Sequence, residues 1–370
     1  MKHYFLGSAA NYSGKQIVRH TFAIGREKDR GALQRFLTKK YSGKTVLTKN
    51  GRSALALALK SYLQPGDGVI VNGFTCYAVY EAIKAAGLVP IWADIDKINL
   101  NFNEGTLEDA ILNNSNAKIK GIIIQNSLGN PVDIAAIEKF AKKYDLVMIE
   151  DLAHCAGVKY PDGREAGTVG VAAALSFGKD KSIDTISGGA IILRDPSNIT
   201  IEAPSKAPRI SDSLRARFYP LFGAISRGLS YVRLGGAWMK LLVKIHWVEK
   251  SADNRLDLSR KITKFQARLA LKQLQELKKS GESPIRDFCL VRDRAEALKK
   301  LRSKGYYFDG FWYERPVSPE RYYRKVHFPE KDCPVSVETA RKIINIPTYY
   351  SKKDLEPARK IIAEYKEEKQ

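Results

Sequence analysis

The stretch "IKGIIIQNSLGNPVDIAAIEKFAKKYDLVMIED", from Ile119 to Asp151, contains the pattern that decides the fold. Two apolar runs of strand length, at 119–125 and 146–151, flank residues 133–144, where apolar side chains recur at the spacing of a helix. Parallel strands need a long crossover connection between them, and a helix of this length supplies one. The stretch therefore predicts a βαβ unit.

The same alternation of strands and helices extends on both sides of this unit, over residues 44–193. Strands are predicted at 44–48, 68–74, 89–95, 119–125, 146–151, 172–177 and 189–193. Helices are predicted at 52–63, 76–87 and 133–144. Strands separated by such helices form a mostly parallel sheet with helices on both of its faces. The predicted fold class is therefore α/β with three layers, and ligands are expected at the carboxyl ends of the strands.

The length of 370 residues exceeds the usual size of one domain, so one large and one smaller domain are expected. With 44% hydrophobic residues, the chain can bury a substantial core. We assign residues 1–255 to the large domain. Residues 256–370 are predicted to begin with a long amphipathic helix at 256–279 and to continue as a smaller α+β domain.

The sequence favours a cytoplasmic location. Its first residues contain no apolar stretch of signal-peptide length, and no later segment approaches the ~20 apolar residues of a membrane span. The four cysteines lie far apart, and the five histidines form no metal-binding pattern. We therefore expect neither a disulfide framework nor a metal site.

The formal net charge of +22 favours an anionic partner, such as nucleic acid, an anionic membrane or a phosphorylated small molecule. Charge alone does not choose among them. Residues 201–255 form a basic aromatic insertion, with six arginines and lysines between Arg215 and Lys244. Such a segment can lie on an anionic membrane surface. Alternatively, it is a helix pair that packs against the core or a subunit interface.

Two loops at strand ends carry candidate binding residues. In "KNGRSALALAL", Gly51 lets a ligand approach the start of a helix, where backbone N–H groups and the Ser53 hydroxyl can bind phosphate. The same letters are also those of an ordinary helix start. In "VMIEDLAHCAG", Asp151 ends an apolar strand, and His154 follows it. A carboxylate buried there needs a partner, either a structural cation or the protonated ring nitrogen of a cofactor.

The stretch "LSFGKDKSIDTISGG" places two lysines, Lys179 and Lys181, between two predicted buried strands. Desolvation there lowers the pKa of an amine toward its nucleophilic form, which can form a Schiff base. The Ser176 hydroxyl can donate a further hydrogen bond to a phosphate, and the loop around Cys76 can cover a flat ring. A phosphate cradle, a buried carboxylate and such a lysine are together what pyridoxal 5′-phosphate (PLP) requires.

At these residues the sequence resembles the sugar aminotransferases of the DegT/DnrJ/EryC1/StrS family, which have the aspartate aminotransferase-like fold (fold type I). The resemblance rests on "NGRSALALAL", "FTCYAVYEAIKAAGLVPIWADID", "SLGNPVDIAAIEKFAKKYDLVMIEDLAHCAG", "SFGKDKSIDTISGG" and "CPVSVETARKIINIPTYY". It covers residues 44–193 well and the C-terminal part moderately, whereas it does not cover residues 201–255 convincingly.

The resemblance implies a role for each candidate residue. Lys181, five residues after the family's serine, matches the Schiff-base lysine, and Asp151 matches the partner of the pyridine nitrogen. His154 matches the residue beside the phenolic oxygen of the cofactor. Three residues match phosphate-binding positions: Gly51, Arg52 and Ser176. One position departs from the family, because Cys76 stands where an aromatic residue often stacks on the ring.

The function that the resemblance implies is transamination of a keto group on a nucleotide-activated sugar, with glutamate as the amino donor, as in polysaccharide biosynthesis. It also implies a homodimer in which the region around Asn254 and Arg255 completes the partner's site, and no nucleic acid as partner. The alternatives are a PLP-dependent dehydratase, against which Lys181 argues because dehydratases of the family have histidine there, and a non-catalytic membrane-associated binding or regulatory protein.

Overall fold

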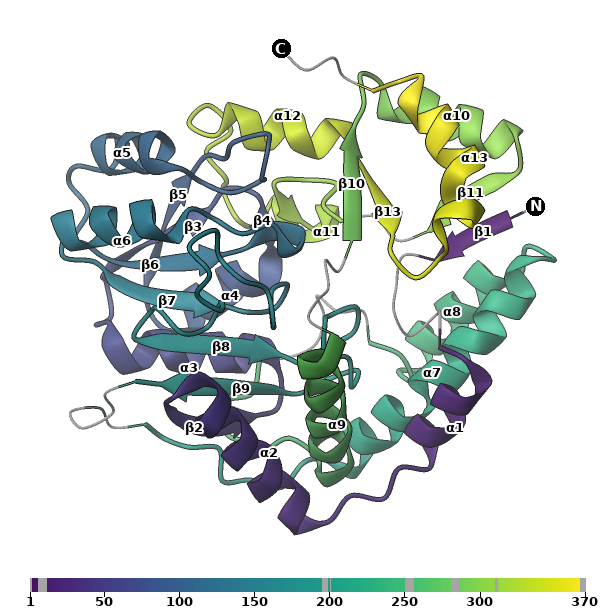
Figure 1. The fold of residues 1–370 in the computed structure, drawn as a ribbon, viewed down its shortest axis with the longest axis horizontal. Helices are drawn as coiled ribbons and strands as arrows, with labels where there is room; N and C mark the ends of the chain where they lie inside the picture. Colours follow the sequence, from purple (N-terminus) through teal and green to yellow (C-terminus); the bar gives the residue numbers. More distant parts are fainter. Residues whose placement is uncertain are drawn as a thin grey trace.

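The computed structural model describes residues 2–5, 12–194, 199, 201–249, 256–280, 286–309 and 312–366. Its main sheet has seven strands (Figure 1), in the order β2 (Lys44–Thr48), β9 (Gly189–Leu193), β8 (Ala172–Ser176), β7 (Val147–Asp151), β6 (Ile119–Gln125), β3 (Gly68–Asn72) and β5 (Val89–Ala93). Strand β9 runs antiparallel to both of its neighbours, and the remaining pairs are parallel. The mostly parallel α/β sheet predicted from the sequence is confirmed.

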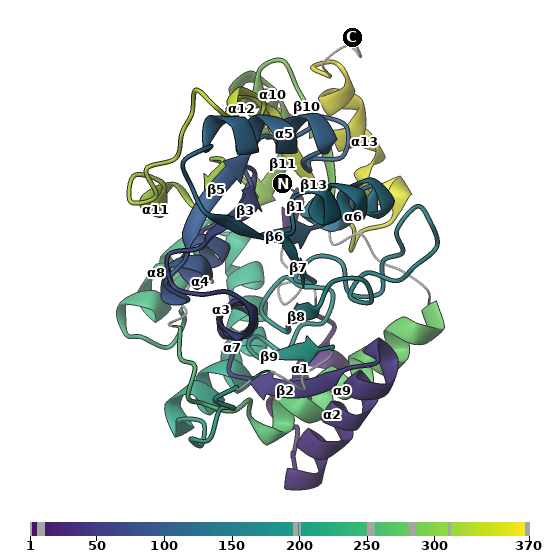
Figure 2. The ribbon, with the colours of Figure 1, turned by 90° about the vertical axis from the view of Figure 1, so that its left-hand side faces the viewer.

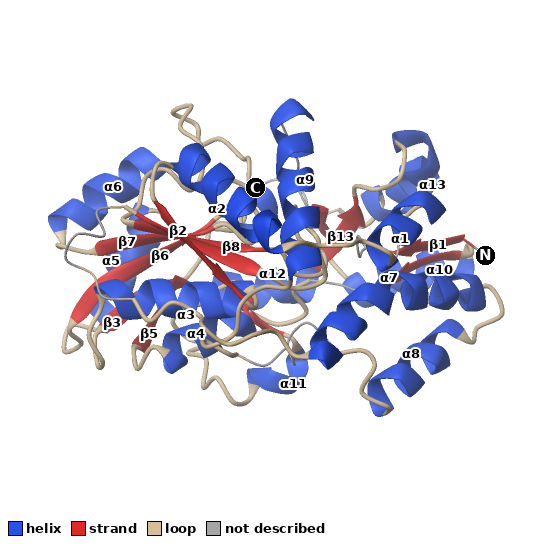
Figure 3. Ribbon diagram, turned by 90° about the horizontal axis from the view of Figure 1, so that it is seen from below, coloured by secondary structure: helices blue, strands red, loops and turns tan. Residues whose placement is uncertain are grey.

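Helices cover both faces of this sheet and give three layers, as the view along the sheet shows (Figure 3). One face is covered by α2 (Glu27–Tyr41), α5 (Glu104–Asn113), α6 (Ile134–Lys143) and α9 (Lys264–Ser280), and the other by α3 (Gly51–Tyr62) and α4 (Tyr77–Ala85). Strand β6 illustrates why: Ile122 and Ile124 join the apolar cluster of the first face, and Ile123 joins that of the second. A strand buried on both faces is apolar throughout.

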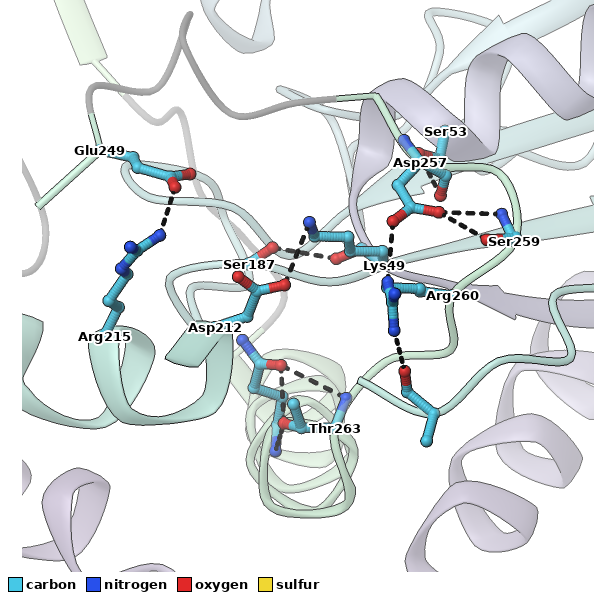
Figure 4. Close-up of polar contacts among 12 residues, drawn as sticks. Lys49, Ser53, Ser187, Asp212, Arg215, Glu249, Asp257, Ser259, Arg260 and Thr263 are labelled. Carbon is cyan, nitrogen blue, oxygen red and sulfur yellow. Dashed lines mark hydrogen bonds and ion pairs between the residues drawn. The ribbon is translucent and has the colours of Figure 1, made fainter. Parts of the chain in front are cut away.

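Helix α9 begins later than the sequence pattern predicted. The prediction placed a helix over 256–279, but the first residues of that range form a turn, which Figure 4 shows. The carboxylate of Asp257 accepts hydrogen bonds from the backbone N and the hydroxyl of Ser259, at 3.1 and 2.8 Å, and such local bonds compete with a helix. The helix starts after Thr263, whose hydroxyl accepts from the backbone N of Gln266 at 3.3 Å.

The C-terminal part is the smaller α+β unit that the sequence predicted. Its strands are β10 (Arg286–Leu290) paired with β13 (Ile343–Pro347), β11 (Tyr306–Asp309) paired with β1 (Lys2–Phe5), and β12 (Val317–Ser318) paired with β4 (Thr75–Cys76). Its helices are α10 (Arg294–Ser303), α11 (Glu320–Tyr323), α12 (Pro334–Lys342) and α13 (Lys352–Ala363). These elements gather at one end of the molecule, and α2 and α9 lie at the other (Figure 2). The first strand of the chain thus lies beside its last elements.

The basic aromatic segment contains a helix pair, α7 (Ile210–Ser230) and α8 (Gly235–Lys244). Helix α7 packs against α1 (Gly14–Thr21), where His20 Nε2 lies 3.0 Å from the backbone oxygen of Ala216. Arg217 donates to the backbone oxygens of Thr21 and Ala23, at 3.1 and 2.8 Å. No helix in the described part of the chain has the length and apolar character needed to cross a membrane.

Candidate active site

A cavity lies where β6, β7 and β8 end, at residues Gln125, Asp151 and Ser176. Its described lining consists of Gly51, Arg52, Leu55, Cys76, Ala78, Val79, Gln125, Asn126, Ser127, Asp151, Ala153, His154, Ser176, Lys181 and Tyr313. Seven of the eight site residues predicted from the sequence are among them, and Ser53 is the exception. Residues separated by more than a hundred positions therefore surround one space.

The start of α3 forms one end of the cavity. Asn50 caps this helix, because its side chain accepts a hydrogen bond from the backbone N of Ser53 at 2.8 Å. Gly51 lies so close to β8 that a Cβ atom on it would stand 2.4 Å from Cβ of Ser176. Only glycine therefore fits here. The positive end of the α3 dipole and the Ser176 hydroxyl meet in this corner, which suits an anion such as phosphate.

Two of the predicted phosphate-binding side chains have protein partners. Arg52 forms an ion pair with Glu81 of α4. The Ser53 hydroxyl exchanges hydrogen bonds with the backbone of Asp257, donating to its oxygen at 3.1 Å and accepting from its N at 3.2 Å. Figure 4 shows this contact beside the ion pair of Lys49 with Asp212. The hydroxyl of Ser53 therefore joins α3 to the segment before α9 and does not face the cavity.

Asp151 forms the opposite end of the cavity. Its carboxylate accepts a hydrogen bond from the backbone N of Ala153 at 3.0 Å and a long one from Gln125 Nε2 at 3.4 Å. No described cation lies within ion-pair distance of it. Burial raises the pKa of the Asp151 carboxyl, although the Ala153 N–H, the charge of Lys181 and Gln125 oppose this shift. A buried carboxylate is costly without a cationic partner, so Asp151 is suited to pair with a cationic ring nitrogen of a ligand.

Gln125 is a site residue that the sequence reasoning missed. It ends β6, donates to Asp151 and accepts a hydrogen bond from the Thr75 hydroxyl at 2.9 Å. It therefore links the loop after β3 to the buried carboxylate. The available signal was its place as the first polar residue after the apolar run of β6, at the carboxyl end of a parallel strand.

Lys181 and His154 meet at the centre of the cavity wall, with Lys181 Nζ 3.0 Å from His154 Nε2. The other ring nitrogen of His154, Nδ1, accepts a hydrogen bond from the backbone N of Leu128 at 3.2 Å. A neutral imidazole with this partner carries its proton on Nε2, which then donates to Lys181. The contact therefore places the two titratable nitrogens within proton-transfer distance of each other.

Lys179 points elsewhere. Its amine contacts the backbone oxygen of Glu249 and lies 4.5 Å from the ring centroid of Tyr219 on α7. It lines a second, separate cavity, together with Lys49 and Asp212. Of the two lysines that the sequence offered, only Lys181 lines the cavity with Asp151 and His154.

The loop that carries Lys181 is held by Asp184. The backbone takes left-handed conformations at Asp180 and Ile186, with φ of 65° and 70°, which costs energy in any residue with a side chain. The Asp184 carboxylate accepts hydrogen bonds from the backbone N of both residues, at 3.1 and 2.8 Å. The side chain of Gln273 on α9 accepts a hydrogen bond from the Asp184 backbone N at 2.8 Å and donates one to the Asp184 backbone O at 2.7 Å. The loop is therefore fixed to the core.

The lining of the cavity also includes Cys76 and Ala153. Cys76 is half-buried, and its sulfur accepts from the backbone N of Ala78 at 3.5 Å. An aromatic side chain that the sequence reasoning did not single out, Trp312, lies next to His154. Trp312 stacks on His154, with ring centroids 4.8 Å apart and planes 17° apart. Together with the anion corner and the buried carboxylate, the surfaces of Cys76 and Ala153 fit PLP.

Comparison with known proteins agrees with this geometry. Residues 30–365 match the model of the DegT/DnrJ/EryC1/StrS aminotransferase family. A pleiotropic regulatory protein of Geobacillus stearothermophilus is 32% identical over 179 residues, which are 48% of this chain and 46% of that relative. GDP-perosamine synthase of Escherichia coli O157:H7 is 37% identical over 147 residues, 40% of this chain and 39% of that relative. This chain thus spans less than half the length of either relative.

Solved structures show the same fold. Spr1654 from Streptococcus pneumoniae, in its PLP-form, has a TM-score of 0.65 at 17% identity, over 95% of this chain and 96% of that chain. The fold and the family match define the class of the protein: the chain belongs to the DegT/DnrJ/EryC1/StrS aminotransferase family, a family of PLP-dependent sugar aminotransferases. The resemblance and the cofactor inferred from the sequence are thereby confirmed.

Proposed function

We propose that this protein transfers an amino group from glutamate to a keto group on a nucleotide-activated sugar, using PLP. One observation carries the proposal. A single cavity joins the amine of Lys181, the buried carboxylate of Asp151 and the anion corner at Gly51. These three groups correspond, in the same order, to the aldehyde, the ring nitrogen and the phosphate of PLP. When bound, PLP supplies an electron sink that allows a carbonyl and an amine to be interconverted.

Each residue of the cavity has a proposed task in holding the cofactor. The backbone at Gly51 and the Ser176 hydroxyl bind the phosphate, with Arg52 beside them. Asp151 holds the ring nitrogen protonated, and its ionised form is then favoured by the new cationic neighbour. Cys76 covers one face of the ring as a small, polarizable contact.

Lys181 and His154 are the proposed proton carriers. With PLP bound, Lys181 would be the residue that holds the cofactor's aldehyde carbon covalently, with loss of water, and once released it would be the base that takes up the proton of the donor's α-carbon. Nε2 of His154, 3.0 Å from Lys181 Nζ, keeps the amine oriented through its hydrogen bond. The same groups return the proton when the keto sugar is aminated.

The substrate class rests on the family and on charge. Relatives carry names of enzymes for nucleotide sugars, such as GDP-perosamine synthase. A net charge of +22 attracts the diphosphate of such a substrate. Glutamate as donor and a cytoplasmic location, where nucleotide sugars are made, remain parts of the same proposal.

A spectrum of the purified protein tests the function. With PLP it should absorb in the visible, and glutamate should convert this band to a near-ultraviolet one, while a keto sugar nucleotide restores it. Lys181→Ala is the matched control, which should bind PLP without this response. A wild-type protein that binds PLP but does not respond to any amino acid would exclude transamination.

Two alternatives are weaker. A dehydratase of this family has histidine at the position of Lys181, so the lysine argues against it. A non-catalytic regulatory protein finds support in the name of one relative, the pleiotropic regulatory protein of Geobacillus stearothermophilus. The spectral test separates this alternative from an enzyme, since a regulator has no need of the response to glutamate.

We further propose a homodimer. Helix α1 and the residues after it expose Phe22 and Ile24, with 73% and 71% of their surfaces accessible, beside α7. A second copy would remove this apolar surface from water. The region around Asn254 and Arg255, proposed to reach the partner's cavity, lies outside the described residues. Light scattering should give twice the chain mass, and a fully active monomer would contradict the proposal.

We also propose that the α7–α8 turn touches an anionic membrane. Three large apolar residues are exposed there: Tyr231 (57%), Val232 (63%) and Leu234 (55%). Lys240 and Lys244 are exposed on the neighbouring helix. Basic side chains near an anionic bilayer each contribute about 1 kcal/mol, and apolar ones insert beside them.

Liposome sedimentation tests the membrane contact. The variant changes three exposed basic residues to glutamine: Arg233, Lys240 and Lys244. The matched control removes equal charge from α10 and its C-cap residue: Lys299, Lys300 and Lys304. Binding to anionic vesicles should fall about a hundredfold in the variant and little in the control. Equal binding of both proteins, or equal binding to neutral vesicles, would contradict a specific contact.

A further inference from the structure

Gln125 and Asp151 are neighbours because of the register of the main sheet. Strands β6 and β7 are parallel, and their last residues, Gln125 and Asp151, are paired across the two strands. Paired residues of adjacent strands point to the same face of a sheet, and both of these line the cavity. Both are buried, so water contributes little to the solvation of the carboxylate. The amide of Gln125 is therefore placed to affect the chemistry of Asp151.

The orientation of the Gln125 amide follows from its two contacts. An ionised carboxylate only accepts hydrogen bonds, so Nε2 of Gln125 must be the atom that faces Asp151, 3.4 Å from Oδ2. The amide oxygen then lies on the other side, where it accepts a hydrogen bond from the Thr75 hydroxyl at 2.9 Å. A flipped amide would set its oxygen against the carboxylate. The three side chains therefore form a directed chain of donors that ends at Asp151.

Thr75 is fixed by a part of the chain that lies outside the main sheet. It belongs to β4, which pairs with β12, and it stands opposite Val317 in that pair. Its backbone N donates to the backbone oxygen of Pro316 at 2.7 Å. Both Thr75 and Val317 are fully buried. The hydroxyl that orients Gln125 is thus held in place by a backbone pairing in the protein interior.

Each oxygen of the Asp151 carboxylate has a donor of its own. Oδ1 accepts from the backbone N of Ala153 at 3.0 Å, and Oδ2 accepts from Gln125. One donor on each oxygen fixes the plane of the carboxylate, which a single donor does not. Burial raises the pKa of the Asp151 carboxyl, and the contact with Gln125 is one of those that oppose this rise. A carboxylate has about four acceptor positions, so it can still accept a bond from a ligand.

We propose that Gln125, oriented by Thr75, is a positioning residue for Asp151: it fixes the plane of the carboxylate and keeps it ionised, so that the proton between this carboxylate and the ring nitrogen of PLP stays on the nitrogen. This inference rests on the proposed function and deepens it, because it names what prepares Asp151 for the cofactor. Since Gln125 acts through Asp151, its effect should disappear when Asp151 is replaced.

Binding of two cofactor forms tests the inference without turnover. The probes are PLP and its analogue with carbon in place of the ring nitrogen, each titrated into the PLP-free protein and followed by absorbance. The wild type should prefer PLP, because only PLP has a nitrogen for Asp151. Gln125→Met, which keeps a similar volume and removes the donor, should reduce this preference about fivefold. Gln34→Met on α2, where Nε2 donates to the backbone oxygen of Thr45, is the matched control and should leave the preference unchanged.

Variants of Thr75 and a double variant trace the effect to Asp151. Thr75→Val removes the hydroxyl that orients the amide and should lower the preference in the same direction, whereas Thr75→Ser keeps the hydroxyl and should retain the wild-type preference. The pair also tests the inference if Gln125→Met does not fold. In a protein that already carries Asp151→Asn, Gln125→Met should cause no further change in the preference.

The inference and the proposed function fail in different ways. If Gln125→Met weakens the binding of PLP and of the analogue equally, or if its effect persists beside Asp151→Asn, Gln125 supports the fold only and the inference is wrong. A wild type without a preference for PLP also overturns the inference, while the response to glutamate still decides the function. A wild type that prefers PLP but responds to no amino acid overturns the proposed function alone.

Discussion

Exchanging the two neighbouring carboxylates of β7 for amides should separate a structural group from a chemical one. Glu150 is fully buried, and its carboxylate accepts four hydrogen bonds. The donors are the Tyr160 hydroxyl at 2.9 Å and the backbone N atoms of Gly167, Val169 and Gly170 at 2.7, 2.9 and 2.8 Å. This carboxylate therefore organises the loop between β7 and β8 and does not face the cavity.

The cost of Glu150→Gln follows from these four bonds. The best orientation of the amide lets its NH₂ group donate to the Tyr160 hydroxyl, but it leaves the Gly167 N–H without an acceptor. An unpaired buried N–H costs about 1–3 kcal/mol, and the two bonds to the other oxygen each lose roughly 1 kcal/mol without the charge. We expect a loss of about 3–5 kcal/mol, a large part of a typical stability of about 5–15 kcal/mol.

Asp151→Asn should behave differently. The carboxylate of Asp151 accepts one bond of normal length, from Ala153 N, and an asparagine oxygen can accept it as well. Burial raises the pKa of the Asp151 carboxyl in the folded protein, so this group stabilises the fold at acid pH and loses that contribution as the pH rises through the folded pKa. At neutral pH the variant without PLP should therefore be at least as stable as the wild type.

The chemical cost of Asp151→Asn should instead be large. An amide does not hold the ring nitrogen protonated, so the negative charge that develops at the reacting carbon loses its stabilisation. One such preorganised electrostatic contact is worth about 10²–10³-fold in rate. The glutamate half-reaction should slow by at least about a hundredfold.

Two measurements on the same pair of variants decide the matter. Urea unfolding of the PLP-free proteins at pH 5 and 7.5 gives their stabilities, and stopped-flow absorbance gives the rate with glutamate. A loss of stability in Asp151→Asn as large as that in Glu150→Gln would show that Asp151 is a structural carboxylate. A wild-type rate in Asp151→Asn would refute the assigned role directly.

Three further outcomes are expected. Borohydride reduction of the PLP-loaded protein and peptide mapping should place the pyridoxyl group on Lys181, and a group on Lys179 would contradict the assignment. Gly51→Ala should weaken PLP binding at least about tenfold, since its Cβ would stand 2.4 Å from Cβ of Ser176, whereas unchanged affinity would exclude the phosphate corner. Asp184→Ala removes the acceptor of the buried Ile186 N–H and of the part-buried Asp180 N–H, and should lower stability by about 1–3 kcal/mol in urea unfolding; an unchanged midpoint would show that the loop needs no anchor.

The main sheet was predictable because its strands are apolar on both faces. The run at 119–125 became β6 with the same bounds, and the strand predicted at 189–193 became β9. The antiparallel direction of β9 was not predictable from such a run, because a fully apolar strand gives no sign of its direction. The late start of α9 was missed because a turn at Asp257 interrupts a pattern that is otherwise helical.

The site was predictable only in part, and the reason differs between residues. Backbone-determined positions, such as Gly51 and the strand end at Asp151, follow from local pattern. The partners of Arg52 and Ser53 do not, because Glu81 and Asp257 come from distant parts of the chain and engage these side chains through tertiary contacts. A helix start gives the same sequence signal whether its hydroxyl binds a ligand or another segment.

The two groups that the sequence concealed, Gln125 and Trp312, come from different parts of the chain and contact different residues of the site. Gln125 acts on the cofactor side, where it contacts Asp151, so its loss should alter how the ring nitrogen is held. Trp312 comes from the C-terminal part, in a segment whose backbone is anchored at Asn345 and whose next residue, Tyr313, lines the cavity. The carboxylate and its amide partner thus come from the main sheet, whereas Trp312 comes from a separate unit, and local sequence pattern does not reveal that the fold brings the two units together at Lys181.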